Sequence, residues 1–529
     1  MTPQREGAYV NLATIDIAIL VIYAIGIFLL AQWVSREKGE HKKDAQDYFL
    51  ASRSLPWWAI GTSLIAANIS AEQIVGMSGS GYVMGMAIAS YEWMAALTLI
   101  IVGKWILPVF LKNGIYTMPE FLERRYSPAV RTVMAVFWLV LYIFVNLTSI
   151  LWLGSLAVNA ITGLEIQTSI TALALFALLY ALYGGLKAVA LTDIVQVSLL
   201  VAGGIIITWI SLNEVGGHAG VIAGFHELTN RFPEKFDMIL SPDNPHYKDL
   251  PGLAVLLGGM WMMNVSYWGF NQYIIQRGLA AKSVNEAQKG IVLAAFLKLI
   301  MPFIIVVPGI AALVLSPGLA HTDQAYPSLM ANLPIGIKGL VFAALVAAIV
   351  ASTGSKINSI ATIFTMDLYR AARPQTSQQT LVKVGRIVAI VSILIAIVIT
   401  KPFLSNFQQG FQYIQDFTGF VTPGICVIFL LGLFWERTTA TAAMTAALVT
   451  VLMSAAFRIW LPDYPFMNRV GWCFVVGMVI AVGISLASPP RTTALRVDIK
   501  NVDFKTGTGF NIAALSVVAI LACLYAMWW

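Results

Sequence analysis

Fourteen long apolar runs follow one another along this chain of 529 residues. A run of about 20 apolar residues can cross about 30 Å of hydrocarbon. Lipid cannot hydrogen-bond exposed N–H and C=O groups, so such a run must be a helix. The runs therefore predict an all-α polytopic membrane protein with 14 transmembrane helices. We expect these spans near 13–34, 56–78, 82–110, 130–160, 164–183, 188–212, 251–273, 288–316, 334–369, 382–402, 408–434, 440–460, 467–488 and 508–528.

The composition excludes most other classes of protein. The chain is 58% hydrophobic and 11% charged, against about 25% charged residues in an average soluble domain. The three cysteines all fall in apolar runs, which argues against a disulfide framework or a metal cluster. The apolar core contains neither a nucleophile–base pair nor a metal cluster, so we do not expect an enzyme.

Lysine and arginine side chains orient the predicted helices, because cytoplasmic loops carry an excess of them. Of the 33 Lys and Arg residues, 22 lie in loops on one side of the predicted membrane and eight on the other. The first loop on the richer side contains Arg36, Lys38, Lys42 and Lys43. This side is predicted to be cytoplasmic, with both termini outside. The net charge of +7 is thus explained by basic residues that orient the protein in the membrane, and it predicts no nucleic-acid partner. No obligate protein partner is evident either.

The second span is interrupted by polar residues at mid-membrane depth. Asn68, Ser70, Glu72 and Gln73 fall within six positions of an otherwise apolar run. Polar and ionisable groups at this depth are functional candidates, and a helix broken there exposes backbone groups that can bind ions and substrates. The alternative is an unbroken helix whose polar stripe packs against other helices.

The seventh span carries a similar interruption, W-M-M-N-V-S-Y-W-G-F-N-Q-Y, from Trp261 to Tyr273. Polar breaks in spans that lie five positions apart are typical of two inverted repeats with the binding site at their interface. We therefore predict that spans two to six form one repeat and spans seven to eleven the other.

Four further charged residues fall in or at the ends of apolar runs. Asp193 begins the sixth span, and Lys104 lies within the third, where no role is evident. Lys298 must find an acceptor or extend to the cytoplasmic interface. Lys356 lies four residues after Ser352, on the same helical face.

At these positions the chain resembles the solute:sodium symporters, in particular bacterial members that carry sugars. The resemblance covers nearly the whole chain. The segments that carry it are Tyr48–Trp58, Leu64–Gly76, Ala89–Lys104, Tyr142–Ser149, Tyr267–Gln276, Ile363–Tyr369 and Phe411–Gly419.

The fold implied by the resemblance is a LeuT-like inverted five-helix repeat with one helix before it and three after. The implied domains are an N-terminal helix and cytoplasmic loop (1–55), a first repeat (56–212), an extracellular loop (213–250), a second repeat (251–434) and three C-terminal helices (435–529).

The resemblance also implies the residues of a sugar site. The hydrogen-bonding residues would be Asn68, Gln73, Glu92, Asn264, Lys298 and Gln415. Tyr267 would stack beneath the sugar ring as an inner gate, and Met77, Tyr91 and Phe411 would form the outer gate. The chain has Ala95 where the galactose-carrying relatives have a serine, which leaves the choice between galactose and glucose open.

A sodium site is implied at the break of the second span. The carbonyls of Ala66, Ile69 and Ala348 and the hydroxyl of Ser352 would be ligands, with Asp193 close by. The family has two adjacent serines, but this chain has Ala351 before Ser352, so Thr353 or water would fill the gap.

Lys356 leaves two interpretations open at this site. In the first, its ammonium would occupy or neighbour the cation position, which would change the ion affinity or make the carrier proton-coupled. Alternatively, it extends toward the cytoplasm and pairs with Asp193.

Together these features predict sodium-coupled symport of a hexose, galactose or glucose, across a bacterial inner membrane by alternating access, with Na+ as the coupling ion and the lipid bilayer as surroundings. Alternatives are the same fold carrying myo-inositol, another polyol or sialic acid, proton-coupled sugar uptake, and a membrane sensor that binds sugar without moving it.

Overall fold

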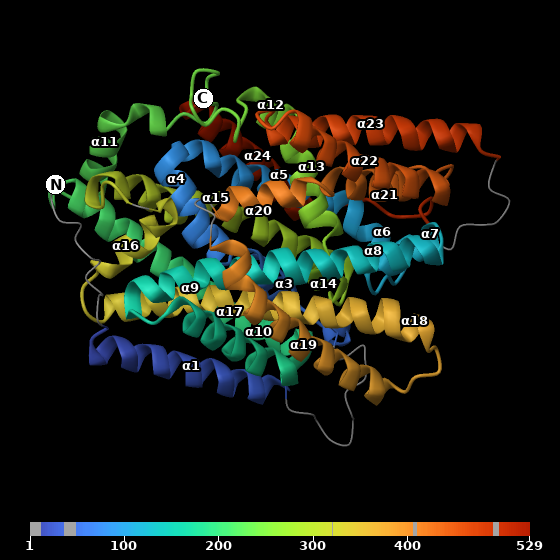
Figure 1. Cartoon of the computed structure of the whole chain (residues 1–529), viewed down its shortest axis with the longest axis horizontal. Helices are drawn as coiled ribbons and strands as arrows, with labels where there is room; N and C mark the ends of the chain where they lie inside the picture. Colours follow the sequence, from blue (N-terminus) through green and yellow to red (C-terminus); the bar gives the residue numbers. More distant parts are fainter. Residues whose placement is uncertain (1–11, 36–48, 320, 406–409, 490–496) are drawn as a thin grey trace.

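The computed structural model describes residues 12–35, 49–319, 321–405, 410–489 and 497–529. Within these ranges the secondary structure is helical, apart from one isolated β-bridge between Leu55 and Ala281 (Figure 1). The predicted all-α fold class is therefore confirmed.

The helices of the N-terminal half, in chain order, are α1 (Thr14–Ser35), α3 (Trp57–Asn68), the π-helix η2 (Glu72–Met77), α4 (Ser78–Met84), α5 (Ser90–Ile101), α6 (Leu107–Lys112), α7 (Met118–Arg125), α8 (Pro128–Val140), the π-helix η5 (Leu141–Leu147), α9 (Thr148–Thr162), α10 (Ile166–Val215), α11 (Val221–Arg231), α12 (Leu253–Leu257) and α13 (Gly259–Val265).

The helices that follow are the π-helix η7 (Ser266–Phe270), α14 (Gln272–Leu279), α15 (Val284–Leu315), the short 3-10 helix η8 (Thr322–Gln324), α16 (Ala325–Ala331), α17 (Ile337–Ile363), α18 (Arg370–Ala372), α19 (Gln378–Leu404), α20 (Gly410–Gly419), α21 (Thr422–Phe434), α22 (Ala440–Trp460), α23 (Phe466–Ala487) and α24 (Thr508–Met527).

Ten of the described helices are long and apolar enough to cross a membrane. The pair α20 and α21, bent by 49°, adds an eleventh if it is one span. A loop is expected between spans 164–183 and 188–212. The backbone there is helical, because α10 continues without interruption, so the expected loop is wrong. A straight helix of that length, 50 residues, would extend about 75 Å, more than twice the hydrocarbon thickness.

Both spans that carry polar interruptions are broken. Helix α3 ends at Asn68, and Ile69 has an extended ψ of 110° before the chain turns into η2. In the seventh span, Asn271 has an extended ψ of 120° between η7 and α14. The alternative of an unbroken second span with a polar stripe is therefore wrong.

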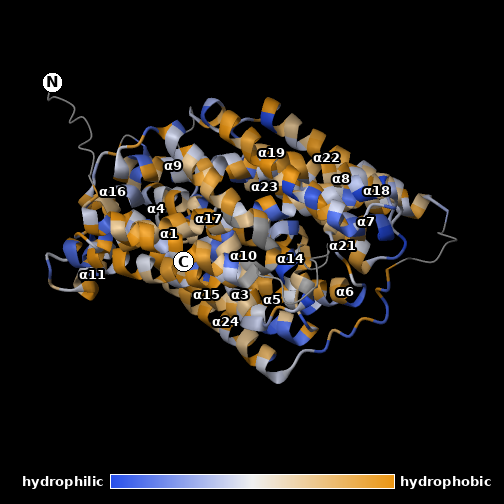
Figure 2. Ribbon diagram, turned by 90° about the horizontal axis from the view of Figure 1, so that it is seen from below, coloured by the Kyte–Doolittle hydropathy of each residue, from blue (hydrophilic) through white to orange (hydrophobic). Residues whose placement is uncertain are grey.

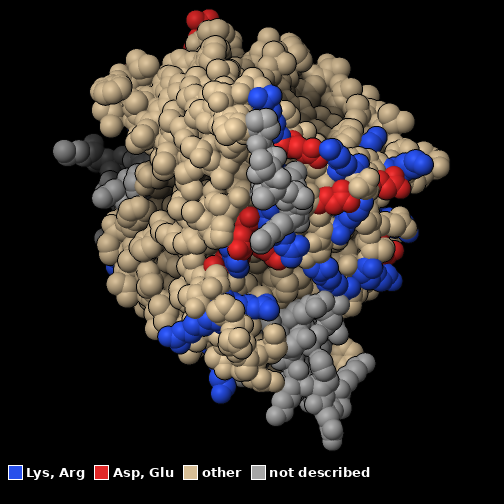
Figure 3. Space-filling view, turned by 90° about the vertical axis from the view of Figure 1, so that its right-hand side faces the viewer, with Lys and Arg blue, Asp and Glu red and all other residues tan. Residues whose placement is uncertain are grey.

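Loops predicted to be cytoplasmic contact one another at one end of the molecule. Lys112 pairs with Asp498 at 3.2 Å, and the Arg53 guanidinium donates to the Gly114 carbonyl at 2.9 Å. Helices α7 and α18 lie at this end, on the right of Figure 1, and Figure 3 shows Lys and Arg gathered across it. Arg36, Lys38, Lys42, Lys43, Arg491 and Arg496 lie outside the described residues.

Residues of the loop 213–250 contact the C-terminal end of the chain. The Met238 N–H donates to the Trp528 carbonyl at 2.7 Å, and the rings of Phe225 and Trp528 lie 6.4 Å apart. This loop and the end of α24 therefore share one side.

The outer helices present apolar side chains to the surroundings. Ile22 on α1, Val398 on α19 and Leu515 on α24 are each about 70% exposed, and Figure 2 shows hydrophobic residues along the outer helices. In water such a surface would be strongly unfavourable, whereas in a bilayer it is solvated by lipid tails. Helices α3, α4, α5, α9, α15 and α17 pack against one another inside this layer.

Candidate substrate and cation site

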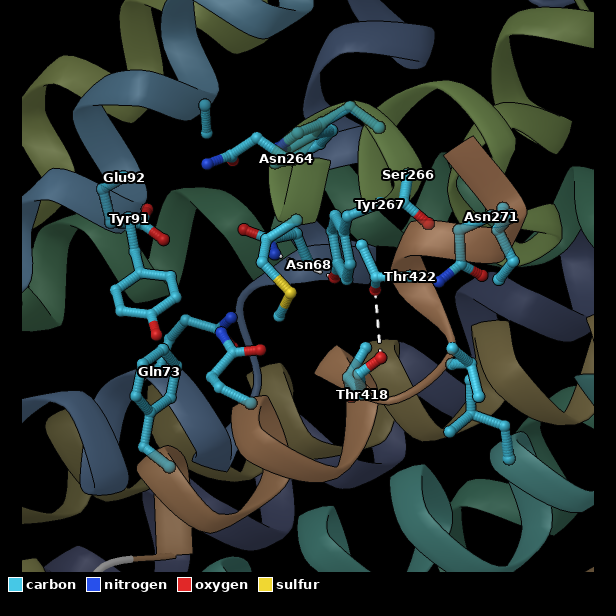
Figure 4. Close-up of a pocket in the computed structure, with 18 of the residues that line it drawn as sticks. Asn68, Gln73, Tyr91, Glu92, Asn264, Ser266, Tyr267, Asn271, Thr418 and Thr422 are labelled. Carbon is cyan, nitrogen blue, oxygen red and sulfur yellow. Dashed lines mark hydrogen bonds between the residues drawn. The ribbon is translucent and has the colours of Figure 1, made fainter. Parts of the chain in front are cut away.

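A cavity lies between the two broken spans (Figure 4). Its walls come from the α3–η2 break, α5, α8, η5, α13, η7, α15, α20 and α21. All seven residues expected at the sugar site line it: Asn68, Gln73, Glu92, Asn264, Tyr267, Lys298 and Gln415. The fold thus brings together side chains that are more than 340 positions apart along the chain.

A buried ion pair forms one wall of the cavity. The Lys298 ammonium lies 2.5 Å from Oε2 of Glu92 and also donates to Oδ1 of Asn68. The pair is almost fully buried, with side chains 1% and 4% exposed. Lys298 thus has an acceptor and does not extend to the interface. The Trp268 ring lies 5.1 Å from its ammonium and adds a cation–π contact.

Tyr267 is joined to this pair through Asn68. Its hydroxyl accepts a hydrogen bond from Asn68 Nδ2 at 2.9 Å and another from the Tyr273 hydroxyl at 2.6 Å. Its ring is therefore held in place by contacts with both broken spans. A fixed aromatic face of this kind suits the C–H face of a sugar, while the polar side chains around it suit hydroxyls.

The expected outer gate is only partly assembled at the cavity. The rings of Tyr91 and Phe411 meet edge to face, with centroids 5.1 Å apart, and both line the cavity. Met77 is fully buried in η2 and is not among the lining residues.

Several lining residues were not predicted individually. Ser266 and Asn271 belong to the polar interruption of the seventh span. Trp138, Thr418 and Thr422 come from runs in which nothing marked them. Thr418 and Thr422 flank the bend between α20 and α21, and the Thr422 hydroxyl donates to the Thr418 carbonyl at 3.0 Å.

The break after α3 frees backbone oxygen at the expected sodium site. In a continuous helix the Ser70 N–H would donate to the Ala66 carbonyl. Here it donates to Oε1 of Gln73 at 3.3 Å. Ala66 and the neighbouring Ile69 are buried at this point.

The facing helix α17 supplies further oxygens. The Ser352 hydroxyl donates to the Ala348 carbonyl at 2.9 Å, which leaves its oxygen lone pairs able to accept or to coordinate a cation. The buried Thr353 hydroxyl has no hydrogen-bond partner among the described residues. Free oxygens of this kind fit a hard monovalent cation.

Asp193 is paired with an arginine. Its Oδ2 accepts from the Ser63 hydroxyl and lies 3.7 Å from the Arg277 guanidinium, with both side chains fully buried. Arg277 also donates to the Ser355 hydroxyl. The second oxygen of Asp193 has no hydrogen-bond partner among the described residues.

Lys356 does not pair with Asp193, so that interpretation is wrong. Its ammonium lies 3.5 Å from Oε2 of Glu72 and 4.9 Å from the centre of the Tyr273 ring. A helical side chain leans toward the N-terminal turn, which directs Lys356 to the broken span rather than to the C-terminal end of α17. Lys104, whose role was open, lies 5.0 Å over the Trp105 ring.

Comparison with known proteins decides the class. The profile of the Sodium:solute symporter family matches residues 48–450. The chain belongs to this family. It is 50% identical to a sodium/glucose cotransporter of Vibrio parahaemolyticus over 98% of this chain and 99% of that protein. A human sodium/myo-inositol cotransporter is 31% identical over 91% of this chain and 74% of that protein.

Solved structures share the fold. A Na+-coupled sialic acid symporter in an outward-open state superposes with a TM-score of 0.79 at 24% identity, over 90% of this chain and 99% of that one. Mhp1, a nucleobase-cation-symport-1 transporter, superposes with a TM-score of 0.54 at 13% identity, over 84% and 95%. At these identities the likeness concerns the fold alone.

As a sodium:solute symporter, the chain is a multi-pass membrane transporter and not an enzyme, and sodium is its coupling ion. The exposed apolar side chains of the outer helices agree with a multi-pass membrane protein.

Proposed function

We propose that this symporter carries a neutral hexose, glucose or galactose, together with sodium into a bacterial cell by alternating access. The observation that carries the proposal is the Glu92–Lys298 pair, joined through Asn68 to Tyr267 at the junction of the two broken spans. The relative from Vibrio, named a sodium/glucose cotransporter and 50% identical over nearly the full length, supports it.

The charge of the cavity favours an uncharged cargo. Glu92 neutralises Lys298, so the described residues that line the cavity leave no free cation to attract a carboxylate. The amides of Gln73, Asn264 and Gln415 and the carboxylate of Glu92 offer both donors and acceptors, as sugar hydroxyls require. An anionic cargo such as sialate would leave its charge without a matching partner in this cavity.

We infer that the fold has 14 spans, arranged as a LeuT-like inverted repeat. Three segments would add to the eleven: α3 with the adjoining η2, which is divided off from the long helical segment Glu72–Lys112, the apolar first part of α10 at Ile166–Leu179, and α12 to α14. The first and the last of these contain no single helix long enough to cross a membrane, because both are broken. Broken helices are expected where a transporter binds its cargo. The two breaks, five predicted spans apart, support repeats at 56–212 and 251–434, flanked by the segments 1–55 and 435–529 and separated by the loop 213–250.

Sodium would bind between the α3 break and α17. The proposed ligands are the carbonyls of Ala66, Ile69 and Ala348 and the Ser352 hydroxyl, with Thr353 replacing the family's second serine. Asp193 acts from a distance in this scheme, because Arg277 already pairs with it.

The chain is proposed to lie in the bilayer of the inner membrane, with both termini on the outer side. The clustering of basic loops at one end and the contact of Trp528 with the loop 213–250 support this orientation. Labelling of single cysteines with an impermeant maleimide tests it: a cysteine at Lys248 should react from outside the cell, and one at Lys500 only after the membrane is opened.

The transport proposal is tested with purified protein in liposomes. Labelled glucose and galactose are offered with an inward sodium gradient, an inward proton gradient, or neither. We expect accumulation only with sodium, and its loss in Glu92→Gln. Glu227→Gln, an exposed position on α11, is the matched control and should transport normally.

Other outcomes would redirect the proposal. Accumulation driven by protons and indifferent to sodium would overturn the coupling. Accumulation of myo-inositol in place of hexose would overturn the cargo. Sugar binding without accumulation under either gradient would indicate a sensor.

A further inference from the structure

The ammonium of Lys356 lies beside the break of the second predicted span. Its side chain is 1% exposed, and its nitrogen is 3.5 Å from Oε2 of Glu72. Isolated ionised groups are very costly within a membrane, so each of these two charges requires the other. The pair joins the broken element η2 to helix α17.

Glu72 is surrounded by oxygen atoms as well as by this one ammonium. Its Oε1 accepts from the Ser149 hydroxyl of α9, and its Oε2 accepts from the Ser70 hydroxyl at 3.3 Å. The Ser70 hydroxyl also lies 3.1 Å from Oε1 of Gln73. A carboxylate with hydroxyl and amide oxygens is a set that hard cations such as Na+ prefer.

Among the described residues, the Lys356 ammonium is the only positive charge in contact with this set of oxygens. Lys356 lies four residues from Ser352, which is about 6 Å along the helix. The backbone of Lys356 is thus about one helical turn from Ser352 of the proposed sodium site, on the same face, and its side chain leans toward that turn.

We propose that Glu72, Ser70 and Ser149 form a second cation position, next to the sodium site, which this chain fills with its own Lys356 ammonium. This inference rests on the proposed sodium-coupled transport. Lys356 is accordingly a residue that sets how many sodium ions the carrier binds: without its ammonium, the buried Glu72 carboxylate takes up one more.

The second position contacts the sugar cavity at two points. Gln73, which lines the cavity (Figure 4), shares the Ser70 hydroxyl with Glu72. The Tyr273 ring, which lies beneath the Lys356 ammonium, is hydrogen bonded through its hydroxyl to Tyr267. A mobile ion in place of the fixed ammonium would therefore make sugar affinity depend on a second sodium ion.

The test counts bound sodium. Equilibrium binding of 22Na+ to purified protein is measured for the wild type, Lys356→Met, and the double variant Lys356→Met/Glu72→Gln. We expect Lys356→Met to bind one more ion per chain than the wild type, and the double variant to return to the wild-type number. Lys104→Met, which removes a lysine over Trp105 in the π-helix η4 (Val102–Ile106), should match the wild type.

A second measurement applies if the Lys356→Met protein folds poorly without a cation. Its melting temperature is compared in sodium chloride and choline chloride. We expect sodium to raise it more than in the wild type, because sodium replaces a missing internal charge.

An unchanged ion number with an unchanged sodium effect on melting would overturn the second position. So would an extra ion that persists when Glu72 is also replaced. A wild-type protein that neither binds sodium nor accumulates sugar under a sodium gradient would instead contradict the proposed function itself.

Discussion

Asn68 donates a hydrogen bond to the hydroxyl of Tyr267 at 2.9 Å, across 199 positions of sequence. Asn68 is the last residue of α3, and Tyr267 lies in the π-helix η7 just before the break at Asn271. The two broken spans thus meet through one polar contact next to the buried Glu92–Lys298 pair. A movement of either break must change this contact, so it is well placed to link substrate binding to a conformational change.

Replacing Tyr267 separates the roles of its ring and its hydroxyl. Tyr267→Phe keeps the ring but removes one partner each from Asn68 and Tyr273. A hydrogen bond contributes about 0.5–1.5 kcal/mol, so we expect a sugar affinity about 2- to 10-fold weaker. Tyr267→Ala also removes the stacking face and should weaken it further. The concentration dependence of sodium-driven uptake measures both, and a Tyr267→Ala variant with wild-type affinity would contradict the stacking role.

Breaking the Glu92–Lys298 pair should destabilise the protein as well as weaken sugar binding. Lys298→Met leaves a buried carboxylate without its partner, and loss of one member of a buried pair costs about 3–5 kcal/mol. The double variant Lys298→Met/Glu92→Gln removes both charges and should recover much of the stability but not the sugar binding. Melting in detergent and sugar binding are measured side by side. If the double variant binds sugar as the wild type does, the assignment of both residues to the sugar site is wrong.

Asp323 should make stability depend on pH. Burial raises the pKa of this carboxyl from 3.8 to about 7, although its Oδ2 accepts the Gly410 N–H at 3.0 Å. The folded protein then holds the proton more tightly than the unfolded chain, so the free energy of unfolding falls as pH rises from about 4 to about 7. Asp323→Asn cannot lose a proton and should remove this part of the slope.

Melting of purified protein between pH 4 and 8 checks this expectation. The comparison is between the wild type, Asp323→Asn, and Asp243→Asn, an exposed position in the loop 213–250. The last should follow the wild type. Identical pH profiles for wild type and Asp323→Asn would show that the buried carboxyl does not titrate in this range.

Gly309 allows α15 to approach α4 closely. A methyl group there would lie 2.1 Å from the Ser78 carbonyl oxygen, so Gly309→Ala must push two packed helices apart. Small residues permit such contacts between membrane helices. We expect lower expression and a lower melting temperature. Gly483→Ala on α23, where nothing lies within 4 Å of the added methyl, is the matched control and should be neutral or slightly stabilising.

Sequence by itself determined the membrane character of this protein and the places where two spans break. The reason is that a bilayer tolerates few polar groups, so Asn68, Glu72, Asn264 and Asn271 stand out in apolar runs. Low charge and long apolar runs likewise required helices and excluded a soluble fold.

Only the tertiary structure decided which buried charges meet. Sequence left Lys356 between the cation site and Asp193, whereas packing of both α17 and η2 against α9 sets it beside Glu72, and Arg277 pairs with Asp193. The break expected near 184–187 is helical for the same reason: hydropathy records how far each residue prefers lipid, but not the path of the backbone. Ion-pair partners depend on which helices lie side by side, and that is a property of the packed bundle rather than of any one span.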